Sequence, residues 1–418
     1  MRLQEGSIEF CHTVYPSSPV FMQIKLVLVF TAVLFQLGNA HGGVHVISEL
    51  TDPAFLLAGA VVAEDAVVYI AGNGVAAVNV SNPTQPELLV SLRHPLLFGC
   101  GGLHIYRSAD EGNLRLAVTC SSTDTLMLID VENPRELKVL GTISDFVVLS
   151  RAADVVVKGN LAFVAVPGAA SVVSFDITSE ASPVHLSSIK LSGADSVSLL
   201  DDAHLVVASE RGRRVSTLSF SPHGVLFKIG SIKDERFDGV ISILKHGTLY
   251  LDFTFVISAA NGGTFAVLNT TSQSRPSIVT AMQASVRLAR PAATLKNEGK
   301  YDELGVSYID AGWAPYGHKS ILGATGMVLI ENLIYIVGNT AGTISVMDVS
   351  DPSKPRIIRE LNDARLIGAA NICAANYDQE SISLDGVLQI LVAAVPSTGK
   401  LVLLKDTVER LSIQSAEL

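Results

Sequence analysis

The sequence predicts an all-β fold, a seven-bladed β-propeller of four-stranded antiparallel blades. One observation is a repeated element, an apolar run that ends in Asp and is soon followed by Pro, as in LMLIDVENP (126–134) and ISVMDVSDP (344–352). The other is a composition with 48% hydrophobic residues but only 6% aromatic and 17% charged residues. Small, β-branched side chains suit sheets that are covered on both faces.

The repeated element occurs seven times along the 418 residues. The copies lie at 75–83, 126–134, 172–183, 215–220, 264–276, 344–352 and 400–406. Most begin about 43 to 56 residues apart, with one longer interval of about 79. A period of this size with short strands is typical of stacked or radial repeats.

Each repeat reads as four short strands separated by turn residues. In the third repeat the strands are DVVVKGN (154–160), LAFVAVPG (161–168), SVVSFDI (171–177) and PVHLSSIKL (183–191). The Asp or Asn of the repeated element can bond the following backbone and start a turn, and Pro stops the strand. The element therefore ends the third strand of a blade, and an outer fourth strand follows.

The last repeat predicts how the ring closes. After its third strand, 400–406, the chain offers no convincing outer strand, whereas VHVISEL (44–50) resembles the outer strands of other repeats. We expect 44–50 to complete the last blade, because an unpaired strand edge promotes association.

The element Asp-Val-Ser-Asn/Asp-Pro, followed by an apolar outer strand, resembles the LVIVD-repeat family. Copies two and six match closely, and the resemblance covers about residues 44–406. It implies a β-propeller at or beyond the cell surface. It implies no activity, because the family has no shared catalytic motif.

The N-terminus carries the pattern of a secretory signal. MQIKLVLVFTAVLFQLGNA (22–40) has a basic residue, a short apolar core and small residues before a cleavage point. We expect residues 1–40 to be a signal peptide, with Met22 as an alternative start, 41–406 to be the propeller and 407–418 a tail. The apolar core is short for a membrane span, although retention as an anchor stays open. We expect a secreted, extracellular chain whose mature part has no membrane span.

Two cysteines are placed for a disulfide. A hairpin centred near residue 110 or 111 pairs residues whose numbers sum to about 220–222, so Cys100 opposes Cys120. The alternative is two buried free thiols, and Cys373 has no evident partner. The sequons at Asn79 and Asn269 predict glycosylation in a secreted chain.

Three successive connections between blades place an aspartate in matching positions. Asp154, Asp195 and Asp238 could converge on Ca²⁺ at the mouth of the channel, because this ion prefers several oxygen ligands. The alternative is that each carboxylate bonds its local backbone as part of the repeat. Apart from this weak Ca²⁺ candidate we expect no metal and no cofactor. His94, His104 and His318 are candidates for the same face, without the spacing of a zinc site.

The long interval falls at 287–320, which we expect to be an insertion. It contains the single tryptophan, Trp313, together with Tyr316 and His318, and aromatic residues with polar tips are common binding anchors. Two alternatives stay open: the aromatic residues pin the loop onto the ring, or the segment belongs to an eighth blade.

These observations favour a secreted or cell-surface binding module without catalysis, whose partner is an extracellular protein or glycan. No Gly-x-Ser-x-Gly elbow is present, and the formal charge of −10 without a basic run argues against nucleic acid. The alternative is an extracellular propeller enzyme, of hydrolase or lyase type, that uses Asp and His at the channel mouth. A third reading is a part of a larger extracellular assembly.

Overall fold

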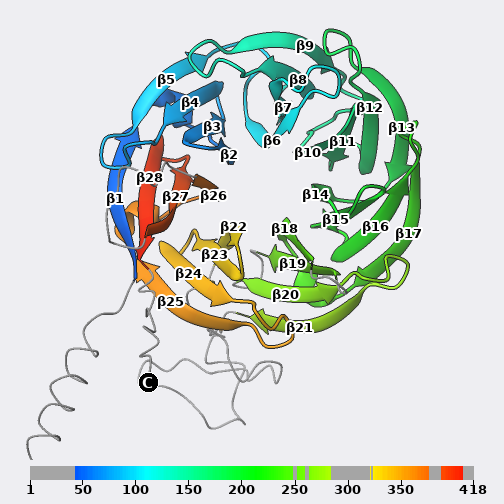
Figure 1. Cartoon of the computed structure of the whole chain (residues 1–418). Helices are drawn as coiled ribbons and strands as arrows, with labels where there is room; N and C mark the ends of the chain where they lie inside the picture. Colours follow the sequence, from blue (N-terminus) through cyan, green and yellow to red (C-terminus); the bar gives the residue numbers. More distant parts are fainter. Residues whose placement is uncertain are drawn as a thin grey trace, which may run out of the picture. The chain divides into compact units, whose positions relative to one another are not determined.

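Each copy of the repeated element forms the third strand of a four-stranded antiparallel sheet. The computed structural model describes residues 43–247, 252–258, 263–283, 321, 323–375 and 387–407, which lie in one unit, Gly43–Thr407. Seven such sheets stand around a ring (Figure 1). The predicted seven-bladed β-propeller is confirmed.

The blades follow chain order, from the inner strand outward. Blade 1 is β2 (Ala60–Glu64), β3 (Val67–Ala71), β4 (Val75–Asn79) and β5 (Glu87–Leu92), and blade 2 is β6 (Cys100–Arg107), β7 (Leu114–Cys120), β8 (Thr125–Asp130) and β9 (Lys138–Ser144). Blade 3 is β10 (Asp154–Lys158), β11 (Leu161–Val166), β12 (Ser171–Asp176) and β13 (Val184–Lys190), and blade 4 is β14 (Ala194–Leu199), β15 (His204–Ser209), β16 (Arg214–Phe220) and β17 (Leu226–Lys233). Blade 5 is β18 (Val240–Gly247), β19 (Asp252–Ser258), β20 (Thr264–Asn269) and β21 (Ser277–Gln283), and blade 6 is β22 (Ala324–Ile330), β23 (Leu333–Gly338), β24 (Thr343–Asp348) and β25 (Arg356–Asn362). Blade 7 is β26 (Asn371–Ala375), β27 (Val387–Val395), β28 (Lys400–Thr407) and β1 (Val44–Thr51).

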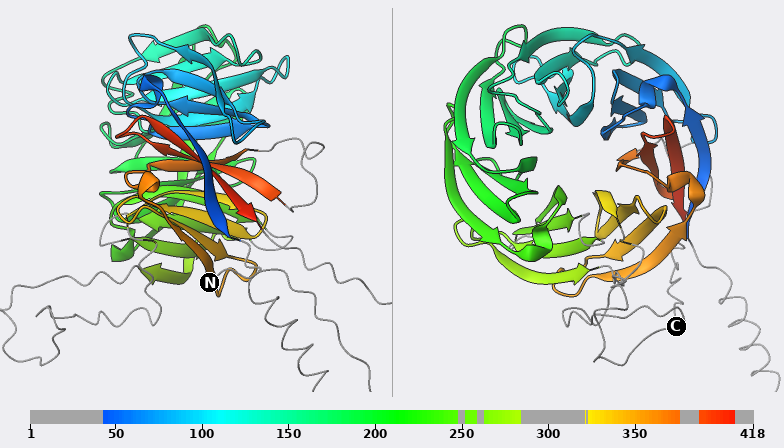
Figure 2. Two further views of the ribbon diagram at one scale, coloured as in Figure 1. Left: turned by 90° about the vertical axis from the view of Figure 1, so that its left-hand side faces the viewer. Right: turned by 180° about the vertical axis from the view of Figure 1, so that it is seen from behind.

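The N-terminal strand closes the ring, as predicted. β1 pairs antiparallel with β28, from Val44 opposite Asp406 to Thr51 opposite Lys400. The two strands lie side by side in both views of Figure 2. Asp406 also holds blade 7 to blade 6, because its Oδ2 accepts hydrogen bonds of 2.6 Å from Tyr335 Oη and Arg359 Nη2.

The core lies between the blades. The middle strands are buried on both faces, whereas an outer strand such as β25 alternates between exposed and half-buried residues. Apolar clusters join neighbouring blades, for example Val68 of blade 1 with Val392 of blade 7. This arrangement explains why the sequence is rich in small apolar residues and poor in aromatic ones.

Antiparallel pairing sorts the loops onto two faces. The crossover face carries the connections from each outer strand to the next inner strand, together with the turns between second and third strands. The opposite face carries the remaining turns. Three 3₁₀ turns are described, and all lie in crossover connections: η1 (Pro53–Phe55), η2 (Glu235–Phe237) and η6 (Ala364–Leu366). Within the described ranges, no helix has the length and apolar character needed to cross a membrane.

Candidate functional site

The inner strands present one equivalent position near the crossover face. In blades 2 to 7 it is the inner-strand residue that lies opposite the last but one residue of the second strand. The residues are Gly102, Asp154, Ser196, Ser242, Gly326 and Asn371. In blades 2, 4, 5 and 6 a one-residue register shift precedes this position, so the extra residue is a β-bulge.

Asp154 joins two blades through hydrogen bonds. Its Oδ1 accepts from Val155 N at 2.9 Å, and its Oδ2 accepts from Ser196 Oγ at 2.9 Å and Val197 N at 3.0 Å. Burial raises the pKa of this carboxyl, and the three hydrogen bonds act in the opposite direction. Asn371 uses its Oδ1 in the same way, to accept from the next backbone N–H at 2.8 Å. The position is therefore part of the contact between neighbouring inner strands.

The three aspartates do not share a register position. Asp195 is the bulged residue ahead of Ser196, and its Oδ2 accepts from Glu210 N at 3.1 Å. Asp238 ends the turn η2 and pairs with Arg213 at 3.1 Å. Across the described residues no three His, Cys, Asp or Glu side chains form a group able to hold a metal ion. The calcium hypothesis thus finds no support there, because the bulge moves Asp195 out of phase and Asp238 lies four residues ahead of the equivalent position.

His104 lies on the same inner strand as Gly102 and is partly buried between blades 2 and 3. Burial lowers the pKa of its imidazole to about 4, and a hydrogen bond with the backbone of Val157 opposes this shift more weakly. The ring is therefore neutral above about pH 5. Gly102 beside it is essential to the packing, because a Cβ there would lie 2.7 Å from Asp154 Cα and 2.8 Å from Ala153 O.

Five crossover connections are built on one turn. A side chain at its start accepts a hydrogen bond from the backbone N–H two residues later, at 2.8 to 3.2 Å. An apolar residue three or four positions after the start is then buried as an anchor, at most 2% exposed. The starting residues are Asp52, His94, Asp145, Asp234 and Asp363, and the anchors are Phe55, Leu97, Leu149, Phe237 and Leu366.

Next to these anchors, four consecutive connections expose large apolar side chains. They join blade 6 to 7, 7 to 1, 1 to 2 and 2 to 3, and we call their exposed residues the apolar belt. Its members are Leu56 (39% exposed), Leu57 (52%), Phe98 (50%), Phe146 (79%), Val147 (63%) and Ile367 (55%). The next two connections carry Ser192 and Asp238 in comparable places, so the belt covers only part of the crossover face.

The connections that carry the belt are bonded to the turns beside them. Backbone hydrogen bonds link the connections through the turns of blades 1 and 2. They are Asn73 N to Leu56 O (3.3 Å), Cys100 N to Gly72 O (3.0 Å), Ser121 N to Gly99 O (3.1 Å) and Asp145 N to Asp124 O (3.0 Å). The β27–β28 turn of blade 7 lies against two further connections, because Leu57 N donates to Pro396 O at 3.3 Å and a Cβ at Gly368 would lie 2.9 Å from Ser397 Oγ. The exposed residues thus sit on connections that are joined to one another through backbone hydrogen bonds.

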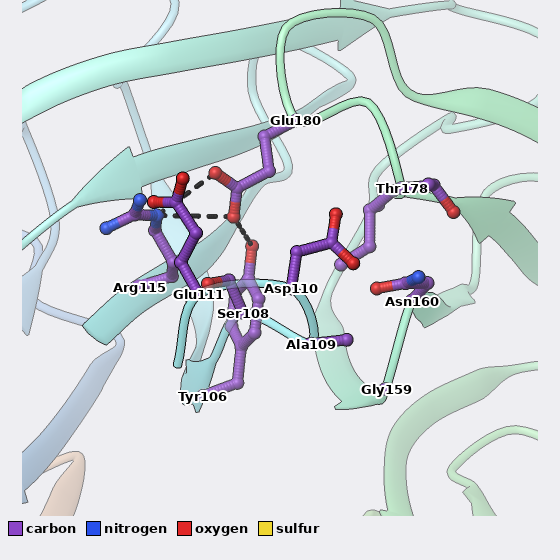
Figure 3. A pocket seen from close by; sticks show the side chains of 11 residues that line it. Tyr106, Ser108, Ala109, Asp110, Glu111, Arg115, Gly159, Asn160, Thr178 and Glu180 are labelled. Atoms are coloured by element: carbon purple, nitrogen blue, oxygen red, sulfur yellow. Dashed lines mark hydrogen bonds and ion pairs between the residues drawn. The ribbon is translucent and has the colours of Figure 1, made fainter. Parts of the chain in front are cut away.

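A hollow of about 200 Å³ lies on the opposite face between blades 2 and 3 (Figure 3). Arg115, 6% exposed, occupies its wall and bonds Glu180 at 3.0 Å and Asp130 at 3.0 Å. Tyr106 Oη donates to Glu180 at 3.4 Å, and burial, reinforced by Glu180, raises the pKa of the phenol. These charged side chains pair with one another across blades 2 and 3, so the main role of the cluster is to stabilise the contact between the two blades.

Three segments of the chain match a known repeat. Residues 58–93, 150–190 and 324–363 match the LVIVD repeat. The chain carries LVIVD repeats. A search of curated proteins finds no match.

Solved structures similar to this LVIVD-repeat propeller share its fold at low identity. Hydrazine synthase from Kuenenia stuttgartiensis aligns with a TM-score of 0.57 and 11% identity over 83% of this chain and 94% of that one. A protein from Lactobacillus plantarum gives 0.52 and 10% over 72% and 84%, and a functionally unknown protein from Desulfotomaculum acetoxidans gives 0.52 and 13% over 79% and 95%. At such identities the likeness shows the fold alone.

The predicted cysteines and sequon asparagines of this LVIVD-repeat propeller lie in blades 1, 2, 5 and 7. Cys100 opposes Cys120 in the β6–β7 register and the two form a disulfide, the pairing expected from the hairpin. Cys373 is free and buried. Asn79 and Asn269 end β4 and β20 on the opposite face.

The predicted aromatic site falls outside the described residues. Trp313, Tyr316 and His318 lie there, as do the rest of the 287–320 insertion, the signal segment 1–40 and the tail from 408. The apolar belt was missed in the sequence. Its signal was present in the similar strings DPAFLLAG (52–59), HPLLFG (94–99) and DARLIG (363–368), in which a capping residue precedes an apolar pair and a glycine.

Proposed function

We propose that the protein is a non-catalytic interaction module that binds a protein partner through the apolar belt. The observation that carries the proposal is that four consecutive connections expose large apolar side chains at neighbouring places. Phe98 and Phe146 alone expose about 250 Å², if a whole aromatic side chain counts as about 200 Å². Exposed apolar surface of several hundred Å² gathered on one face of a domain is typical of interaction sites.

The proposal is tested by comparing two matched triple variants. Phe98→Ser, Phe146→Ser and Ile367→Ser remove belt residues that are 50%, 79% and 55% exposed. The control replaces outer-strand residues of similar exposure, Val184 (56%), Phe227 (52%) and Ile358 (47%), with Ser. Both variants should fold alike, since none of the six side chains is buried.

A photo-crosslinking amino acid at position 98, compared with one at 227, identifies the partner in cells that make the protein. The affinity of the purified partner should then fall at least about tenfold for the belt variant and stay within about twofold for the control, because apolar anchors at the centre of interfaces carry most of the binding energy. Adducts formed equally from both positions, or equal losses in both variants, would contradict the proposal.

We also propose that the protein is secreted. The apolar segment at 22–40 and the disulfide between Cys100 and Cys120 support this, because disulfides persist in oxidising compartments. In each sequon the asparagine side chain accepts from the N–H two residues later, at 2.9 Å for Asn79 and 3.0 Å for Asn269. Glycans there would stand on the face opposite the belt and leave the belt free.

Expression of the full chain tests this second proposal. We expect the protein in the culture medium with an N-terminus at His41 and, in a glycosylating host, a mass decrease after treatment with an N-glycosidase. Protein that stays inside the cell with an intact N-terminus would contradict it.

A further inference from the structure

A shallow hollow of about 350 Å³ opens in the middle of the apolar belt. Its lining residues are Asn73, Arg93, His94, Pro95, Leu97 and Phe98. They come from the second-to-third-strand turn of blade 1 and from the connection between blades 1 and 2. The hollow therefore combines an apolar wall, the half-exposed ring of Phe98, with polar groups at its side.

His94 makes this connection chemically different from the others. It occupies the capping position that is Asp52, Asp145, Asp234 or Asp363 in the other turns of this type, and its Nδ1 accepts from Leu96 N at 3.2 Å. With Nδ1 used as an acceptor, the ring proton resides on Nε2, which is left as a donor. Four turns begin with a carboxylate, whereas this one begins with a hydrogen-bond donor.

Two further groups in the hollow lack partners. Arg93 is exposed and forms no ion pair with any residue in the described part of the chain. Asn73 Oδ1 is buried and accepts no hydrogen bond from the described residues. Asn73 Oδ1 is closed off from solvent, so Arg93 is the group of the two that a ligand in the hollow can reach and pair with.

From these groups we infer that the hollow binds an acidic peptide segment of the protein partner. An Asp or Glu side chain of the partner places its carboxylate at Arg93 and His94 Nε2, and a neighbouring apolar residue packs on Phe98. Arg is suited to this role because its planar guanidinium matches a carboxylate with two parallel hydrogen bonds. The inference rests on the proposed function and adds the chemistry of the partner.

Charge favours a peptide over a lipid headgroup, which would also offer an anion. The belt turns on either side begin with Asp52 and Asp145, and the chain carries a formal charge of −10. An anionic membrane would meet these carboxylates over a wide area and be repelled, whereas a peptide places its single charge at Arg93 and avoids them.

The test starts from peptides selected on the protein itself. A phage-displayed random dodecapeptide library is panned on the wild-type chain and counter-selected on the belt variant with Phe98→Ser, Phe146→Ser and Ile367→Ser. We expect enriched peptides to carry Asp or Glu within three residues of a large apolar residue. A synthetic peptide and its amide analogue, with Gln for Glu or Asn for Asp, are then titrated by fluorescence anisotropy against wild type and Arg93→Gln.

The double-mutant cycle decides the outcome. The amide analogue should bind wild type about tenfold more weakly, Arg93→Gln should weaken the acidic peptide about tenfold, and Arg93→Gln should not distinguish the two peptides. Arg151→Gln, at another exposed arginine of the same face, should stay within about twofold of wild type.

Enriched peptides without an acidic residue, or an acid effect that persists in Arg93→Gln, would overturn the inference and leave the proposed function standing. Two further results would also overturn it: sedimentation with phosphatidylserine vesicles that is lost in Arg93→Gln, which assigns the hollow to a lipid headgroup, and self-association of the wild type that is lost in the same variant. Failure of the proposed function itself shows separately, as equal crosslinking from positions 98 and 227.

Discussion

Protonation of His104 is expected to weaken the contact between blades 2 and 3. The imidazole is partly buried beside the backbone of Val157, and burial lowers its pKa from 6.5 to about 4. The unfolded chain therefore binds a proton at this residue between pH 6.5 and 4, while the folded chain does not. The stabilisation is fully present above pH 6.5 and is lost as the pH falls through this window.

The magnitude follows from the shift. A difference of about 2.5 pKa units corresponds to about 3 kcal/mol of stability at pH 4 relative to pH 7. For a unit the size of Gly43–Thr407 this is a decrease of about 4 °C in melting temperature. His104→Gln keeps a polar group of similar size that cannot be charged.

The assay is thermal unfolding from pH 7.5 to 4.5, followed by circular dichroism. The wild-type melting temperature should fall more steeply than that of His104→Gln, by about 3 to 4 °C over the range. His223→Gln, at an exposed histidine on the opposite face, should follow the wild type. Parallel curves for wild type and His104→Gln would refute the reasoning, because they would mean that the imidazole is equally hydrated in the folded and unfolded chain.

Three further predictions concern the inner strands and the ring. Burial raises the pKa of Asp195 to about 6; the hydrogen bond from Glu210 N opposes this shift, and the charge of Glu210 adds to it. Stability is therefore lost as the pH rises from 3.8 through 6. Asp195→Asn should be about 1 kcal/mol more stable than wild type at pH 7, a value discounted for partial exposure, and no more stable below pH 4 in urea titrations. Gly102→Ala should lower the free energy of unfolding by about 3 kcal/mol in the same assay, because its Cβ would clash with Asp154 and Ala153. Gly101→Ala should lower it by less than about 1 kcal/mol, because the nearest contact of its Cβ is 3.5 Å away. Equal losses in the two variants would contradict the packing argument. Deletion of β1 should lower the melting temperature by more than about 10 °C or give aggregates in light scattering, since the edge of β28 is then unpaired; a truncated chain that melts like wild type would rule out closure by this strand.

The fold could be predicted because the repeat specifies one strand in every blade. Asp130 and Asp348 end third strands, and in both the side chain accepts the N–H two residues later, at 2.9 Å. This hydrogen bond depends only on neighbouring residues, so the sequence alone indicates it. Ring closure was predictable for a related reason: counting strands left the last repeat one short, and 44–50 was the apolar segment that could fill the place.

The inner-strand site was less predictable, because it depends on register. A β-bulge adds one residue without changing the composition of the strand, so Asp154 and Asp195 look equivalent in the sequence and differ by one position in the structure. The burial of His104 has the same origin. Which side of an inner strand faces the next blade is decided by pairing with the second strand, and a one-residue shift reverses it.

The apolar belt shows why exposed sites are the hardest to predict. In HPLLFG the sequence contains three successive large apolar residues, and composition alone would bury all of them. The turn that starts at His94 buries Leu97 (2% exposed) and turns Phe98 outward (50%). The same geometry recurs at Leu366 and Ile367, where burial falls on the first residue of the pair and exposure on the second, at 0% and 55%. The first residue of each pair is buried and anchors the connection, so the second is free to vary with the partner. Changes of binding specificity in this propeller should therefore appear at the second residue and at the capping residue, without loss of the fold.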